Sequence, residues 1–188
     1  MGSTSAQRGR ETRARLLDAA ARLIAEQGWG SVTTRGVAEV AAVPAGAVHY
    51  HFGSVSDLLV DAALDTARRE YEMALGLFGQ APDVATGLDG LLAAVRSYTP
   101  DHQSTVVLSE AMLAAARHER LRVELGALVR QWRTAVSQWL DSHDVADAEA
   151  TATLLGAVVD GLVLHCLLDP EVRDLPMSQP LRRMAGVA

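Results

Sequence analysis

The chain has 188 residues, of which 49% are apolar and most of those are Ala, Leu and Val, a composition typical of a helical protein with a sizeable core. The net charge is −6, yet residues 1–60 carry a small positive excess, which indicates an anionic partner at the N-terminal end. All 17 basic residues are Arg, which excludes lysine-dependent mechanisms, and the single cysteine excludes an internal disulfide and a cysteine-rich metal site.

The first 60 residues contain a polar start and three expected helices. We expect residues 1–10 to form a disordered basic tail without the apolar core of a signal peptide. Leucines and alanines at helical spacing predict an amphipathic helix over residues 11–27, ended by Gly28. A second short helix is expected over residues 31–41 and a third over 45–52, after a turn at Pro44.

The remaining residues are predicted to be helical throughout, with breaks near residues 80–83, 99–101, 118–119, 142–144 and 169–170. No stretch alternates with period two, so the predicted fold class is all-α, with no sheet. We expect a three-helix helix-turn-helix domain over residues 11–55 and a helical bundle for effector binding and dimerisation over 56–188. The apolar run at 151–168 is interrupted by Asp160 and His165, which argues against a membrane span.

Three short helices in under 50 residues, two of them joined by a tight turn, are typical of a helix-turn-helix that reads DNA. The segment from Thr33 to Leu59, TTRGVAEVAAVPAGAVHYHFGSVSDLL, resembles the DNA-binding motif of tetracycline-repressor-type (TetR-type) transcriptional regulators. The segment AVVDGLVLHCLLDP, from Ala157 to Pro170, is similar to the end of the dimerisation helix of such regulators.

Because neither a signal peptide nor a membrane span is predicted, we expect a cytoplasmic protein. The resemblance implies a homodimeric repressor that binds palindromic double-stranded DNA, and no cofactor is expected. It assigns the DNA-binding role to residues of the second and third helices and of the following turn. In that set Thr33 would cap the second helix, while Thr34 and Arg35 would meet phosphates or a base edge. The DNA-binding candidates are Thr33, Thr34, Arg35, Ala45, Gly46, Ala47, His49, Tyr50, His51 and Ser54.

The chain departs from the family pattern in ways that reduce its DNA contacts. Ala45 and Ala47 have only methyl groups, which could at most touch a thymine methyl. His49 replaces the usual tyrosine, Ala42 replaces the usual turn glycine, and Val55 occupies the position of a phosphate-binding lysine. We hypothesise that Arg8, Arg10, Arg13 and Arg15 compensate by reaching a phosphate or the minor groove.

The C-terminal helices carry wide apolar stripes, one of which can face a second subunit. The resemblance implies a dimer built from the last two long helices of each subunit, and an apolar pocket for a small effector, which we expect to be hydrophobic. Trp132 and Trp139 lie two turns apart on one helix, where they fit a core or interface as well as a pocket. The ligand-binding candidates are Met73, Leu77, Phe78, Tyr98, His102, Met112 and Trp132.

Two other classes of function fit the sequence less well. The pair His49 and His51 is a poor metal site, because residues two apart on a helix point in different directions. No phosphate-binding loop, nucleophile elbow or HExxH motif is present, so an enzyme is not predicted. Two alternatives to an effector-controlled regulator remain open: a DNA-binding protein without an effector, and a helical dimer that acts as a protein-interaction module.

Overall fold

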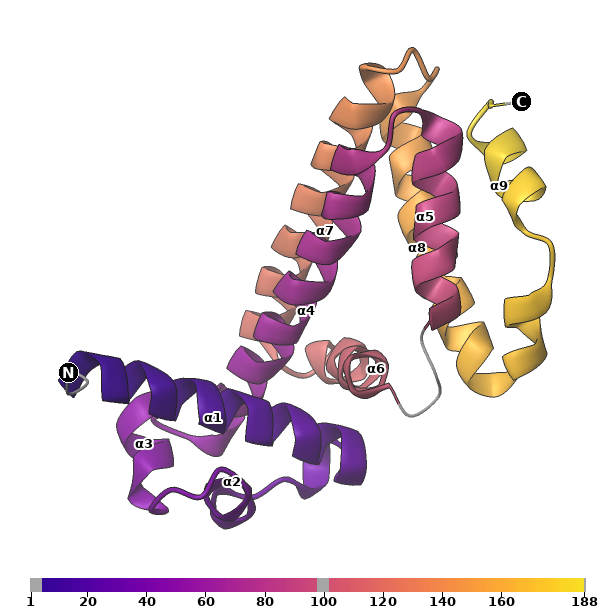
Figure 1. Cartoon of the computed structure of the whole chain (residues 1–188). Coiled ribbons are helices and arrows are strands. Elements are labelled where there is room, and N and C mark those ends of the chain that lie inside the picture. The colour runs from indigo at the N-terminus through magenta and orange to yellow at the C-terminus, as the bar shows by residue number, and fades with distance from the viewer. Residues whose placement is uncertain (1–4, 98–101, 188) are drawn as a thin grey trace. The chain divides into compact units, whose positions relative to one another are not determined.

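The computed structural model describes residues 5–97 and 102–187, and over these residues it contains nine α-helices, two short 3-10 helices and no strand (Figure 1). The predicted all-α fold is confirmed. The α-helices are α1 (Ser5–Gln27), α2 (Thr34–Val40), α3 (Gly46–Phe52), α4 (Val55–Gln80), α5 (Val84–Ser97), α6 (Gln103–Ala115), α7 (Glu119–Asp141), α8 (Ala148–Leu168) and α9 (Ser178–Met184). The 3-10 helices are η1 (Trp29–Ser31) and η2 (Pro170–Asp174).

The chain forms two compact units, whose boundary differs from the expected division at residue 55. The first unit contains residues 1–67 and 106–125, and the second contains residues 68–105 and 126–188. Helices α4, α6 and α7 each contribute one segment to both units, because the boundaries fall within them.

Helix α1 begins earlier than the sequence pattern indicates. Residues 5–10, which were expected to belong to a disordered tail, form its first turns. Ala6, Gln7, Arg8 and Arg10 favour helix, and exposed residues need no apolar periodicity to form one. The helix ends at the predicted place: the Gly28 N–H donates to the Ile24 carbonyl (2.9 Å), and Gly28 has a φ of 78°, which a residue without Cβ adopts readily.

The first unit has a core made by apolar residues one and two helical turns apart. Leu16, Ala20 and Ile24 of α1 are fully buried and form one face of that helix. Val37 of α2 and Val48 of α3 are equally buried. Helices α2 and α3 are too short to be stable alone, so this packing on α1 determines their position.

The second unit has its own core, to which α4, α5, α7, α8 and α9 contribute. Glycines let two tryptophan rings approach closely: a Cβ at Gly87 would lie 2.8 Å from the ring of Trp139, and one at Gly156 would lie 3.0 Å from the ring of Trp132. Cys166 is a buried free thiol, as expected. The core residues are Phe78, Val84, Leu88, Leu91, Leu92, Trp132, Val136, Leu140, Ala152, Leu155, Leu181 and Ala185.

Candidate nucleic-acid interface

The turn between α2 and α3 gives the first unit the geometry of a helix-turn-helix. Thr33 caps α2 as predicted, since its hydroxyl oxygen accepts a hydrogen bond from the Gly36 N–H (3.1 Å). In the turn, the Val43 N–H donates to the Ala38 carbonyl (3.0 Å) and the Ala47 N–H donates to the Pro44 carbonyl (2.9 Å). These bonds fix the direction in which α3 leaves α2.

Arg15 of α1 stabilises this turn through hydrogen bonds to its backbone carbonyls. Its guanidinium donates to the Ala42 carbonyl (2.8 Å) and also to the Ala41 carbonyl. Both carbonyls lie at the C-terminal end of α2, where backbone oxygens lack helical partners and a cation is favoured. Ala42 has a φ of 51°, an unfavourable value for a residue with a Cβ, so Arg15 stabilises a strained turn.

The buried side of α3 is held by apolar packing and by a cation–π contact whose arginine belongs to an ion-pair network. Val48 and Phe52, four residues apart, are both buried. The Arg13 guanidinium carbon lies 4.9 Å from the centroid of the Phe52 ring, and the same side chain donates to the Asp61 carboxylate (2.5 Å). Asp61 also accepts a hydrogen bond from Arg120 (2.5 Å), so one carboxylate joins α1, α4 and α7 within the first unit.

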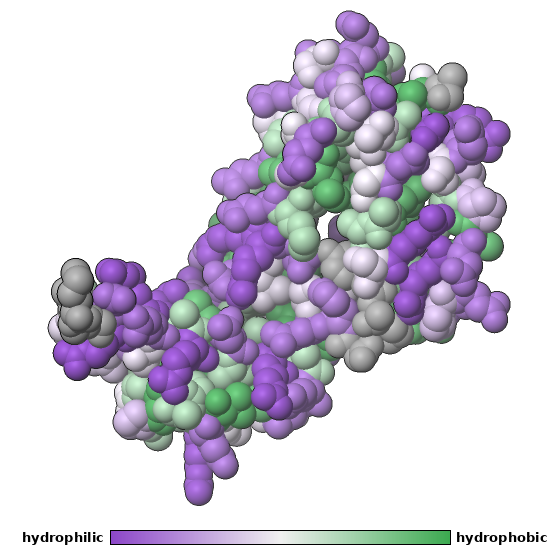
Figure 2. All heavy atoms as spheres, in the orientation of Figure 1, coloured by the Kyte–Doolittle hydropathy of each residue, from purple (hydrophilic) through white to green (hydrophobic). Residues whose placement is uncertain are grey.

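The outer side of α3 is exposed (Figure 2), and hydrophobic residues reach the surface over α2 and α3 between hydrophilic ones. Tyr50 is 85% exposed, which leaves its hydroxyl free to meet a partner. His49 is exposed and its Nδ1 donates to the Gly53 carbonyl (2.8 Å), so Nε2 is the ring nitrogen left for a ligand. Ala45 and Gly46 are exposed as well, while Ala47 and His51 are half-buried.

The other DNA-binding candidates differ in how available they are. Thr33 and Arg35 are exposed and Thr34 is half-buried. The Ser54 hydroxyl donates to the Asp57 carboxylate (2.6 Å) and accepts from the Asp57 N–H (3.1 Å), so it caps α4 and is less free to bind a phosphate.

The five arginines that the sequence suggests as DNA contacts fall into two groups. Arg13 and Arg15 are engaged in the contacts described above, so the structure does not support the hypothesis that they reach out to DNA. Arg8, Arg10 and Arg35 are exposed, and none of them has a hydrogen-bond or ion-pair partner within the part of the chain that the structure describes. Val55 is half-buried and contributes no charge.

Sequence reasoning missed Asp61 and the role of Arg15. Their partners lie 26 to 59 residues away along the chain. No local pattern therefore signals these contacts.

The candidate effector residues do not form one cluster. Phe78 and Trp132 are both buried in the second unit, with ring centroids 6.4 Å apart. Leu77 is half-buried, whereas Met73 is 54% exposed and His102 is exposed, its Nδ1 paired with the Ser104 hydroxyl. Met112 is exposed and belongs to the first unit, and Tyr98 lies outside the described residues.

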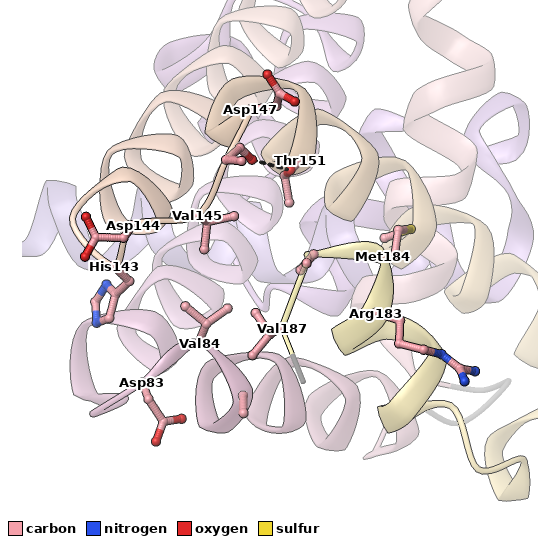
Figure 3. A pocket seen from close by; sticks show the side chains of 14 residues that line it. Asp83, Val84, His143, Asp144, Val145, Asp147, Thr151, Arg183, Met184 and Val187 are labelled. Atoms are coloured by element: carbon pink, nitrogen blue, oxygen red, sulfur yellow. Dashed lines mark hydrogen bonds between the residues drawn. The ribbon is translucent and has the colours of Figure 1, made fainter.

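A hollow of about 770 Å³ lies in the second unit, where the α4–α5 and α7–α8 turns meet the C-terminal end of the chain. Val84, Val145 and Val187 turn toward one another, while Asp83, Asp144, Asp147 and Arg183 point away from its centre (Figure 3). The Asp83 carboxylate accepts the Thr86 N–H (2.7 Å), and this bond lowers the pKa of Asp83. No predicted effector residue lines the hollow.

Two family models match this chain. The one described as "Bacterial regulatory proteins, tetR family" matches residues 16–62, which include α2, α3 and the turn between them. The one described as "Tetracyclin repressor-like, C-terminal domain" matches residues 82–187, more than half of the chain.

Individual proteins agree with these matches. An uncharacterised HTH-type transcriptional regulator of Mycobacterium bovis is 30% identical over 148 residues, which cover 79% of this chain and 72% of that protein. The crystal structure of a candidate transcriptional regulator from Streptomyces coelicolor A3(2) is 28% identical, with a TM-score of 0.72, and the match covers 93% of this chain and 98% of that one. A candidate regulator from Saccharomonospora viridis in complex with choline has a TM-score of 0.77 at 22% identity, over 93% and 95% of the two chains.

Proposed function

Because the chain belongs to the tetracycline-repressor (TetR) family of bacterial transcriptional regulators, we propose that it is a repressor that binds palindromic operator DNA as a homodimer and releases it when a small apolar effector binds. Members of this family are DNA-binding regulators and not enzymes, so the prediction of a non-enzymatic regulator is confirmed at that level. The operator, the effector, the sign of regulation and the cytoplasmic location are parts of the proposal.

The observation that carries the proposal is the exposed outer side of a firmly held α3. Val48 and Phe52 bury the inner side, and Arg15 holds the turn, so α3 can enter a groove without losing its own support. Arg35 at the start of α2 is an exposed guanidinium without an internal partner among the described residues. A guanidinium in that state can bind a phosphate or pair with a guanine edge.

Dimerisation is supported by the surface of α8. Leu154, Leu164 and Leu168 are 53%, 42% and 86% exposed, and their spacing puts them on one side of the helix. The length and mean hydropathy of α8 would also suit a membrane span. We attribute its apolar surface to a second copy of this chain, because members of the family typically act as homodimers.

The effector proposal rests on the aromatic core of the second unit. Trp132 is 6% exposed, and its indole N–H has no acceptor among the described atoms. A buried donor without a partner costs free energy, which an effector carrying a hydrogen-bond acceptor would recover. We therefore propose a largely apolar effector with at least one acceptor group.

Footprinting on the DNA that flanks the protein's own gene tests the regulator directly. We expect one protected palindromic segment, which is lost when an effector from a panel of uncharged aromatic compounds and choline is added. Uniform protection without a sequence preference would favour a structural DNA-binding protein instead. No protection at any concentration would favour the protein-interaction module.

Static light scattering in detergent-free buffer tests the dimer, for which we expect twice the mass of the 20.0 kDa chain. The variant Leu154→Glu together with Leu164→Glu should shift the protein toward the monomer, because two charges would be buried without partners. Glutamate substitutions at the exposed residues Gln80 of α4 and Ala93 of α5, outside the two helices expected at the interface, serve as a control and should leave the mass unchanged.

A further inference from the structure

We propose that the start of α3 reads DNA through thymine methyl groups, so that each operator half-site carries T·A pairs where Ala45 and Ala47 meet the major groove. This inference rests on the proposed function and defines its DNA target more closely. It makes the 5-methyl group of thymine, and not a hydrogen bond, the feature recognised there.

The first observation is chemical. From Pro44 to Val48 no side chain carries a hydrogen-bonding atom. Ala45 and Gly46 are exposed and Ala47 is half-buried, so methyl groups and bare backbone form the surface of this segment. Val40, near the end of α2, is 41% exposed and adds a further apolar side chain beside the turn. No atom lies within 4 Å of the place where a Cβ at Gly46 would stand.

The second observation concerns orientation. The N-terminal residues of a recognition helix are the ones that contact base edges. In this chain Val48 and Phe52 bury one side of α3, and Gly46, two residues before Val48, lies on the side away from it, with Ala45 and Ala47 on its two flanks. Arg15 and the bond from the Ala47 N–H to the Pro44 carbonyl hold the turn before it. The exposed backbone at Gly46, with a methyl group on each flank, is therefore the part of α3 that can enter a groove.

Among the four bases, thymine fits an alanine methyl group best. Its 5-methyl group is the apolar feature of the major-groove edge, whereas the other bases present polar groups there. A polar group covered by Ala45 or Ala47 would lose its water without gaining a partner, which costs free energy. A methyl group covered by a methyl group is stabilised by leaving water.

Uracil provides a sharp test, because it has the same hydrogen-bonding edge as thymine and lacks only the methyl group. The half-site is first selected from a pool of random duplexes, and each thymine is then replaced by uracil, one position at a time. At one or two adjacent positions we expect a loss of affinity of about fourfold for each methyl group removed. At the other positions we expect less than a twofold change.

The variant Ala45→Gly tests whether the Ala45 methyl group causes the preference for thymine over uracil. It should bind thymine- and uracil-containing half-sites equally at the position that Ala45 meets, while wild-type protein still discriminates between them. The control is Arg22→Ala, which removes an exposed side chain of α1 that pairs with Glu26. This control variant should keep the full thymine preference.

Three outcomes are distinguishable. A selected half-site with a local uracil effect that Ala45→Gly abolishes supports the inference. A selected half-site that tolerates uracil at every position, or a thymine preference unchanged in Ala45→Gly, overturns the inference and leaves the proposed function intact. Failure to select any sequence overturns both.

Discussion

Ala42 carries the clearest local strain in the DNA-binding unit, with a φ of 51° in the turn between α2 and α3. This conformation costs a residue with a Cβ roughly 1–2 kcal/mol. Glycine avoids the cost but loses about 0.5–1 kcal/mol through the greater freedom of the unfolded chain. Ala42→Gly should therefore raise the free energy of unfolding by about 0.5–1 kcal/mol, measured by urea denaturation. Unchanged or lower stability would contradict the claim that Ala42 is strained.

Gly87 and Gly90 lie three residues apart on α5 and differ in the space around them. A Cβ at Gly87 would lie 2.8 Å from the Trp139 ring, whereas a Cβ at Gly90 would have no atom within 4 Å. Gly87→Ala should lower the free energy of unfolding by about 1–3 kcal/mol through overpacking. Gly90→Ala is the matched control and should raise it by about 0.5–1 kcal/mol, as expected for alanine in a helix. Equal effects of the two substitutions in thermal unfolding would contradict this account of the core.

Among the elements of the first unit, α1, α4 and α7 are joined at Asp61. Its carboxylate accepts hydrogen bonds from Arg13 and Arg120, and Arg13 in turn covers Phe52 of α3. Asp61→Asn should lower stability by about 1 kcal/mol, since the arginines are half exposed. It should also weaken DNA binding by loosening α3, while the salt dependence stays unchanged because Asp61 is no phosphate contact. A changed salt dependence would show that Asp61 acts on DNA by its charge.

In the second unit, the pKa of Tyr71 on α4 depends on its burial and on the charge of Asp160 on α8. Burial, followed by the nearby charge of Asp160, raises the pKa of Tyr71 to about 12 from an ordinary value of 10.0. Partial loss of water also raises the pKa of Asp160, although the residue is exposed at the surface of the described chain. The phenol of the unfolded chain ionises first, so this contribution to stability is present below pH 10 and is lost as the pH rises to about 12. Ultraviolet titration should resolve a tyrosine near pH 12 that disappears in Tyr71→Phe and persists in Tyr50→Phe.

The sequence predicts the elements well where the pattern is local. Apolar spacing and Pro44 identify α2 and α3 within a few residues, and Thr33 caps α2 as expected. Helix α9 lies in the segment after residue 170 that the sequence predicts to be helical, but the sequence does not predict its bounds, because Leu181 is the only buried residue of the helix. Its position depends on distant partners on α5, where Arg182 bonds Asp89.

The candidate site is predictable only in part, because some of its contacts join residues that are far apart in the sequence. Residue types along α3 indicate which side chains could meet DNA; Gly46, His49 and Tyr50 are exposed, whereas Ala47 and His51 are half-buried. Arg13 and Arg15 look like free cations in the sequence, yet folding brings them to Asp61 and to the end of α2. The buried state of Phe78 and Trp132 likewise depends on packing between helices far apart in the chain.

For the molecule as a whole, the balance of charge limits how DNA can be bound. The net charge of −6 opposes a long-range attraction to DNA, so affinity must come from a few local contacts. Arg8, Arg10 and Arg35 are the exposed arginines without a partner among residues 5–60. A dimer would double this set, so the logarithm of the binding constant should fall with the logarithm of salt concentration with a slope no steeper than about −5.

The central claim, that the first unit binds specific DNA through α2 and α3, is tested most directly by affinity for the footprinted segment across a salt series. The proteins compared are the wild type, Arg35→Ala and the control Arg22→Ala, whose arginine pairs with Glu26 on α1, outside α2 and α3. We predict that Arg35→Ala weakens binding at least about tenfold and makes the salt slope less steep by about 2, while Arg22→Ala behaves as wild type. Equal affinities and slopes for all three proteins would contradict the claim.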